Sequence, residues 1–144
     1  MKNKAKELFR KIVQDHKLCV LATASKDGKP EAATIEYAND ETYNIYFETF
    51  PDYRKYPNLI NNPRASIVIT KEPNTIQMDG TVKEQKGKDA QDAKRRLIVK
   101  HGKGSGFYKD TGIKFFKFTP TWIRILISDK WPPKYEMIAK EDNK

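Results

Sequence analysis

The chain has 144 residues, of which 38% are hydrophobic and 11% aromatic, and its formal net charge is +9. This composition fits one globular domain (1–144) with an ordinary core and excludes a disordered chain. No apolar run approaches the roughly 18 residues that a membrane span needs, and no apolar signal core follows the basic N-terminus. We therefore expect a cytoplasmic protein that does not enter a membrane. The single cysteine, Cys19, excludes an internal disulfide and is expected to be a buried core thiol.

The charge comes from 28 Lys and Arg residues against 19 Asp and Glu residues. A basic balance can serve nucleic acids, anionic membranes or anionic small ligands. Here the cations are scattered along the chain. The densest group, Lys94-Arg95-Arg96, falls on a helical pattern and is followed by Leu97 and Ile98. A solvated helix face explains this group better than a nucleic-acid surface.

In chain order, the first half predicts a helix followed by short strands. Residues 4–16 have the spacing of an amphipathic helix, within an N-terminal helical segment 1–17. Asp27-Gly28 indicates a hairpin turn, because glycine adopts a positive φ at little cost. Pro63 ends a short helix, since the residue before a proline disfavours the helical conformation. The elements expected here are strands at 18–23, 31–37 and 43–49 and a helix at 55–61.

The second half predicts further strands around one longer helix at 88–101. Gly80, inside a strand pattern, indicates a bulge or a close backbone approach. The glycine-rich segment 101–106 lacks the flanking strand and helix of a Walker phosphate loop, which leaves a connection or a gate over a ligand. The tail 140–144 is expected to be disordered. The strands expected here are 65–70, 75–82, 113–119, 121–128 and 134–139. The whole predicts a mainly β protein, an antiparallel six-stranded barrel with peripheral helices.

One stretch, Tyr46 to Lys55, has the features of an anion site. A strand ends at the hydroxyl residue Thr49, and Arg54-Lys55 stand at the start of the short helix. Cations, a hydroxyl and the free N–H groups of a helix start all favour a phosphate. Such junctions are common, so these residues alone do not name the anion.

Other chemistry is weakly indicated. His16, Cys19 and His101 have no paired spacing, so we expect no metal. Glu36 and Glu48 lie on neighbouring predicted strands, where they form either a carboxylate pair or two solvent-facing side chains. No nucleophile, acid or base stands out, and the catalytic residues stay unknown.

The order of motifs resembles the pyridoxamine phosphate oxidase-like, FMN-binding split-barrel family. The resemblance covers roughly residues 18–85, and each of its parts is weak alone. They are Leu21-Ala22-Thr23 before Asp27-Gly28-Lys29-Pro30, then Tyr46-Phe47-Glu48-Thr49, Tyr53-Arg54-Lys55, Asn61-Asn62-Pro63-Arg64-Ala65-Ser66 and Met78-Asp79-Gly80-Thr81-Val82. The resemblance implies a split β-barrel that binds FMN.

The resemblance also implies roles for individual residues. The FMN phosphate would be held by Thr49, Arg54 and Lys55, and the second strand and the strand before Gly80 would line the flavin. Family members are homodimers with FMN at the subunit interface, so we expect contacts from a partner chain and a small-molecule substrate. The implied cofactor-binding residues are Ala33, Thr34, Ile35, Glu36, Glu48, Thr49, Arg54, Lys55, Thr75, Gln77, Trp122 and Arg124.

This chain departs from the oxidase itself at the second strand. The oxidase has an arginine there that helps to hold the phosphate, whereas this chain has Glu31-Ala32-Ala33. One phosphate cation is therefore missing, and the oxidase's C-terminal substrate segment has no counterpart in Trp131–Lys144. Pyridoxamine phosphate is not the expected substrate.

Three hypotheses follow. The first is a flavin-dependent oxidoreductase, with a deazaflavin-using relative inside the same class. The second is a non-catalytic module that binds flavin or heme for storage, sensing or delivery. The third, a basic nucleic-acid-binding barrel, rests on the net charge alone and predicts a steep salt dependence.

Overall fold

A computed structural model describes residues 2–102 and 112–139. The predicted tail 140–144 and most of the glycine-rich segment lie outside these residues. None of the described helices is long and apolar enough to cross a membrane. The elements are α1 (Lys2–Asp15), β1 (Leu18–Ala24), β2 (Pro30–Glu36), β3 (Ala38–Asn39), β4 (Ile45–Thr49), α2 (Lys55–Asn61), β5 (Arg64–Lys71), β6 (Asn74–Gln85), α3 (Gly87–His101), β7 (Lys114–Ser128) and β8 (Lys134–Ala139).

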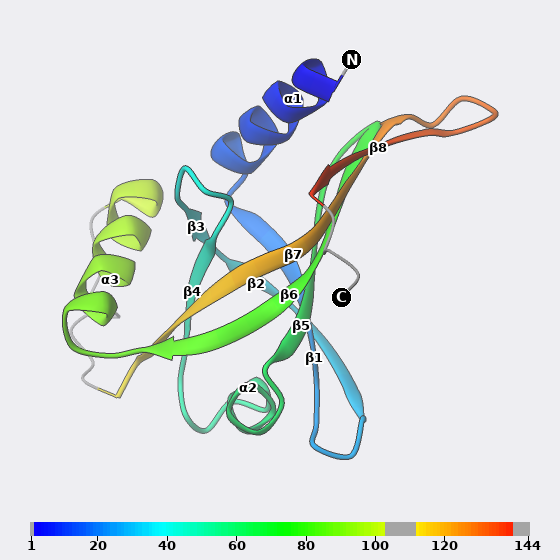
Figure 1. The fold of residues 1–144 in the computed structure, drawn as a ribbon. Coiled ribbons are helices and arrows are strands. Elements are labelled where there is room, and N and C mark those ends of the chain that lie inside the picture. The colour runs from blue at the N-terminus through cyan, green and yellow to red at the C-terminus, as the bar shows by residue number, and fades with distance from the viewer. Residues whose placement is uncertain (1, 103–111, 140–144) are drawn as a thin grey trace.

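The strands form one antiparallel sheet in the order β2-β1-β5-β6-β7-β4-β3, and β8 pairs with β7. The sheet curls, with α1, α2 and α3 at its periphery (Figure 1). This confirms the mainly β, split-barrel prediction. The strand count differs from six, because the two-residue β3 pairs with β4 and because β8 folds back along β7.

The long strand β7 replaces the two strands predicted at 113–119 and 121–128. The expected break at Pro120 is absorbed by a register shift opposite Asp79 and Gly80 instead of ending the strand. A Cβ atom at Gly80 would collide with the carbonyl oxygen of Thr119 and would lie 2.8 Å from the ring of Phe118. The predicted close backbone approach at Gly80 is thereby confirmed, and only glycine allows it.

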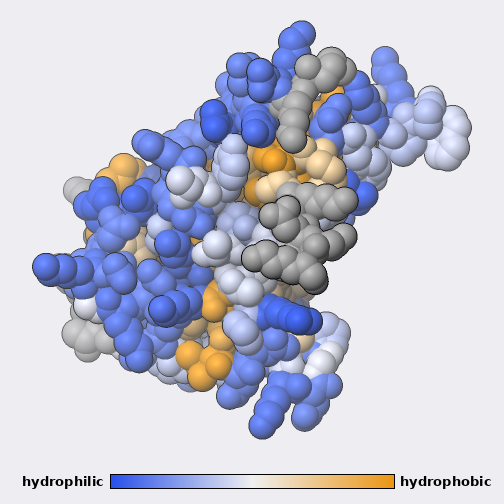
Figure 2. Space-filling model, in the orientation of Figure 1, coloured by the Kyte–Doolittle hydropathy of each residue, from blue (hydrophilic) through white to orange (hydrophobic). Residues whose placement is uncertain are grey.

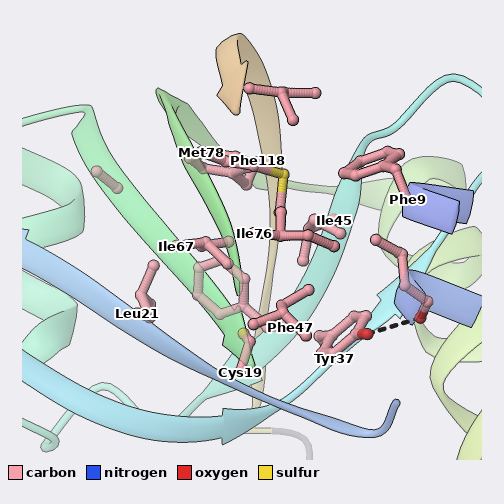
Figure 3. Packing of buried hydrophobic residues seen from close by; sticks show 14 of the residues in the cluster. Phe9, Cys19, Leu21, Tyr37, Ile45, Phe47, Ile67, Ile76, Met78 and Phe118 are labelled. Carbon is pink, nitrogen blue, oxygen red and sulfur yellow. Dashed lines mark hydrogen bonds between the residues drawn. The ribbon is translucent and has the colours of Figure 1, made fainter. Parts of the chain in front are cut away.

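The core fills the inside of the curled sheet and is covered by α1 (Figure 3). Phe9 of α1 and Phe47 of β4 are almost fully buried. Tyr37, which has no exposed surface, donates a hydrogen bond from its hydroxyl to the carbonyl of Val13 at 2.6 Å. Cys19 is buried, and burial raises the pKa of its thiol to about 12. Cys19 is therefore a core residue, as predicted.

A second, smaller core lies under α3. Ala93 and Leu97 of this helix pack on Ala38, Tyr46 and the partly buried Phe115. These contacts fix α3 against β3, β4 and β7. They also explain the helical spacing of residues 88–101, since one face of this helix packs on the sheet.

Candidate functional site

The predicted anion site lies where β4 leads into α2. Arg54 is the N-cap residue of α2 and Lys55 its first helical residue, and no side chain caps this helix end. With only seven residues, α2 supplies little dipole of its own. Any attraction for an anion here comes from the two side-chain charges.

Arg54 already has a carboxylate neighbour. Its Nε lies 3.5 Å from Oε1 of Glu31 on β2, and the Arg54 side chain is 79% exposed while that of Glu31 is 11% exposed. Asn58 of α2 holds the same carboxylate by donating to Oε2 at 3.3 Å, and it also donates to the hydroxyl of Thr23 at 3.1 Å. Glu31 therefore stands beside the cations, in the strand where the sequence lacks the expected arginine.

Lys55 is in a different position. Burial lowers the pKa of its ammonium group, and the charges of Glu31 and Glu48 partly oppose this shift. Among residues 2–102 and 112–139, no carboxylate oxygen lies within 4 Å of its Nζ, which is 5.0 Å from the ring centroid of Tyr53. A partly buried ammonium without an ion pair is what an anionic ligand would complete.

Glu48 of β4 is partly buried, and burial raises the pKa of its carboxyl group to about 7, with a further contribution from the charge of Glu36. In the part of the chain that the structure describes, its Oε2 has no hydrogen-bond partner. Glu36 is half exposed and lies 3.5 Å from Nδ1 of His101, whose Nε2 donates to the carbonyl of Tyr37 at 2.7 Å. Glu48 is therefore not solvent-facing, which was one of the two explanations that the sequence left open.

The remaining residues of this region belong to β2 and β4. Thr49 is only 2% exposed, and its hydroxyl donates to the carbonyl of Phe50 at 3.4 Å. Ala33, Thr34 and Ile35 pair with β1 on one side only, since β2 ends the sheet among the described strands. The outer edge of β2 thus offers backbone groups to a ligand.

A second group of predicted residues lies on β6 and β7. Gln77 and Arg124 are opposite each other in the ladder, and Nη2 of Arg124 donates to Oε1 of Gln77 at 2.6 Å. The guanidinium also lies 5.4 Å from the ring of Trp122 and 4.1 Å from that of Tyr135. Its Nε is buried and has no partner within the described residues. Thr75 is two positions before Gln77 on the same strand.

The two groups are separate in this structure. Strands β1 and β5 stand between β2 and β6. Within residues 2–102 and 112–139, no side-chain hydrogen bond or ion pair joins one group to the other. A single ligand could contact both groups only if it extended across the sheet or if a second copy of the chain brought the second group to the first.

Comparison with known proteins identifies the family. The profile described as "Pyridoxamine 5'-phosphate oxidase" matches residues 5–126. The chain belongs to the pyridoxamine 5'-phosphate oxidase family. The family match covers every predicted cofactor residue, from Ala33 to Arg124. No curated protein sequence matches the chain.

Solved structures share the fold at low sequence identity. A protein of unknown function from Agrobacterium tumefaciens, Atu2129, is 13% identical with a TM-score of 0.77 over 85% of this chain and 56% of its own. A heme binding protein from Mycobacterium smegmatis is 17% identical with a TM-score of 0.72 over 92% and 60%. The heme storage protein HutZ from Vibrio cholerae is 16% identical with a TM-score of 0.63 over 80% and 89%. The chain thus spans less than two thirds of the first two proteins.

Sequence reasoning missed four contributors to these two regions of the family fold. Glu31 pairs with Arg54 from β2, and Asn58 holds the Glu31 carboxylate from a position 27 residues away in sequence. His101 approaches Glu36 from the end of α3, and Tyr135 reaches Arg124 from β8. All four contacts depend on tertiary packing, so no local pattern announces them. Only the departure in the stretch Glu31-Ala32-Ala33 was visible, as the absence of an expected arginine.

Proposed function

We propose that this protein is an FMN-binding oxidoreductase that acts on a small molecule. The proposal is carried by one observation: the partly buried Lys55, beside the loosely paired Arg54, has no carboxylate partner among the described residues. Membership of the oxidase family adds to it. The Arg54–Glu31 pair is weak, because its guanidinium is largely exposed and pairs open to solvent contribute at most about 1 kcal/mol. A phosphate can therefore compete with Glu31 for Arg54. Arg54 and Lys55 thus suit the phosphate group of FMN.

The residues of the chain would divide the work of binding. Arg54 and Lys55 would hold the phosphate, and the free edge of β2, from Ala33 to Glu36, would offer backbone groups to the ring system. Glu48 is mostly neutral below pH 7, since its pKa is about 7, and so repels a phosphate less than a full charge would. A bound flavin supplies the hydride or electron transfer, while the protein supplies binding and electrostatics.

We also propose a homodimer with the cofactor at the subunit interface. Trp122, Arg124, Gln77 and Thr75 would then contact the cofactor of the partner subunit, which resolves the separation of the two groups. Nε of Arg124 has no acceptor within the part of the chain that the structure describes, and this supports the proposal, since a buried donor without an acceptor is costly. Sedimentation analysis should give twice the mass of 16.7 kDa. A monomer in the presence of saturating cofactor would remove the dimer proposal.

The central experiment is a titration of the purified protein with FMN, followed by the visible spectrum and by flavin fluorescence. Binding at micromolar concentrations is expected. NADH or NADPH should then reduce the bound flavin, and an added electron acceptor should restore the oxidised spectrum repeatedly. Absence of FMN binding would end the proposal, whereas binding without turnover would leave only the first half of it.

The second candidate is a module that binds heme or flavin without catalysis, for storage, sensing or delivery. It is favoured by the two structurally similar proteins named for heme binding and heme storage. The propionate groups of heme are anions and would suit Arg54 and Lys55 as a phosphate does. A titration with hemin separates the candidates. A Soret band shift at stoichiometric hemin, with no effect of FMN, would favour the heme module. If the protein binds a deazaflavin in place of FMN, it would still be an oxidoreductase of the first candidate's class, with a different cofactor.

A further inference from the structure

A cavity on the other side of the barrel from α2 has its own cluster of cations. It has a volume of about 320 Å³ and lies between the end of α1, the short strand β3 and α3. Figure 1 shows these three elements converging, and the surface over α3 in Figure 2 is mainly hydrophilic. The basic cavity is lined by Gln14, Asp15, Lys17, Ala38, Asn39, Arg95, Arg96, Val99 and Lys100.

Cations outnumber carboxylates in the basic cavity. Arg95 and Arg96 share one carboxylate, that of Asp92, with Nε of Arg96 at 2.9 Å. Asp15, which also lines the cavity, is paired with Lys11 at 3.3 Å. Neither Lys17 nor Lys100 has a carboxylate oxygen within 4 Å among the residues that the structure describes. The cavity therefore holds more cations than counterions.

Lys100 is held in place by the fold. Its ammonium group donates to the carbonyl of Val13 and to Oδ1 of Asn39, both at 2.8 Å, and lies 3.9 Å from the ring centroid of Tyr37. An ammonium group has three donors, so one remains for a ligand. Burial lowers the pKa of Lys100 to about 8, and the charge of Asp15 opposes part of this shift. An anion in the cavity would oppose it further.

The carbonyl of Val13 does not repel such an anion strongly. It is at the end of α1, where the helix dipole is negative, but it already accepts hydrogen bonds from both Lys100 and the hydroxyl of Tyr37. Arginine side chains supply the forked donors that match phosphate oxygens. Val99, which is 74% exposed, gives the rim an apolar wall for the carbon part of a ligand.

We propose that the basic cavity binds the phosphate group of a small phosphorylated metabolite, at a site separate from Arg54 and Lys55. The concave shape favours a compact anion. An extended polyanion such as a nucleic acid needs a stripe of cations. Its size is at the lower end of small-molecule sites, which span roughly 300–1,000 Å³. Binding would link α1 to α3 through Lys17, Arg95 and Lys100.

The test is an NMR titration of the apo protein with inorganic phosphate at constant ionic strength, with chloride as the balancing anion. The amide signals of Asn39, Val99 and Lys100 should shift and saturate. The exposed variant Lys17→Gln/Arg95→Gln should weaken this binding at least about tenfold, through the loss of charge-assisted hydrogen bonds. Its affinity for FMN at the first site should not change.

The matched control is Lys88→Gln/Lys94→Gln. It also removes two positive charges, but from positions on α3 outside the basic cavity. It should retain the phosphate affinity of the wild type. Equal weakening in both variants, or no saturable shift, would overturn the proposal. So would a single-stranded DNA oligonucleotide that binds tightly and is not displaced by phosphate, because the surface would then serve an extended polyanion.

Discussion

Two clusters of cations on this chain differ in their counterions. At the start of α2, Arg54 and Lys55 stand near two carboxylates, those of Glu31 and Glu48. In the basic cavity, two arginines share one carboxylate, and Lys17 and Lys100 have none among the described residues. The first cluster is close to neutral and the second has excess positive charge.

This difference shows that adjacent cations in a sequence do not by themselves define an anion site. Counterions supplied by distant strands decide how much of the charge is left for a ligand. At α2 the remaining charge depends on the protonation of Glu48 and on the strength of the Arg54–Glu31 pair. At the basic cavity it depends on how firmly the fold holds Lys100. Each of these can be changed separately.

The largest expected effect comes from removing both cations of the first cluster. Arg54→Ala/Lys55→Ala should weaken FMN binding about a thousandfold, or about 4 kcal/mol, because two charge-assisted contacts to the phosphate are lost. The fold should survive, since Arg54 is largely exposed. Fluorescence titration measures the affinity, and circular dichroism checks the fold.

The control for this double variant is Lys17→Ala/Arg95→Ala in the basic cavity, which removes two cations from exposed positions. It should bind FMN like the wild type. FMN binding that survives in Arg54→Ala/Lys55→Ala would place the phosphate elsewhere, and the basic cavity would be the first alternative to examine.

The carboxylate side of the first cluster can be probed by pH. Because burial raises the pKa of Glu48 from 4.5 to about 7, the folded chain binds a proton that the unfolded chain has released between these values. This contribution to stability is fully present below pH 4.5 and is lost as pH rises through 7, amounting to about 3 kcal/mol. Glu48→Gln should abolish this fall in urea unfolding curves, while the exposed Glu41→Gln should retain it.

Lys100 tests how the second cluster is held. Lys100→Met removes two donors, leaving the carbonyl of Val13 with only Tyr37 and leaving Oδ1 of Asn39 unpaired. We expect a loss of about 2 kcal/mol in the free energy of unfolding at pH 7. Arg95→Met, at an exposed position on the same helix, should change it by less than about 0.5 kcal/mol. Equal stability of the two variants would mean that Lys100 is not structurally fixed.

The sequence predicted the elements better than their contacts. Hydrophobic periodicity located β1, α2 and α3 to within one residue, because each buries one face against the barrel. The predicted strand break at Pro120 was wrong, since Gly80 opposite it lets β7 continue through this position. The Arg54-Lys55 pair was visible as adjacent letters. The basic cavity was not, because Lys17 is far in sequence from the cations of α3, and Arg95 and Arg96 were assigned to a solvated helix face. Only the packing of α1 against β3 and α3 brings them together.

The smallest expected effect is at Glu31, the carboxylate that pairs with Arg54 in the first cluster. Glu31→Gln keeps an acceptor for Asn58 but removes the charge beside Arg54. FMN binding should tighten about fivefold, or about 1 kcal/mol, as expected for releasing an exposed ion pair. Riboflavin, which lacks the phosphate, provides the matched ligand and should bind equally to both proteins. If FMN binding tightens and riboflavin binding does not, Arg54 contacts the phosphate, and Glu31 is the residue that limits the affinity of this family member for it. Unchanged FMN affinity would instead place the phosphate away from Arg54, because the charge that Glu31→Gln removes lies beside it.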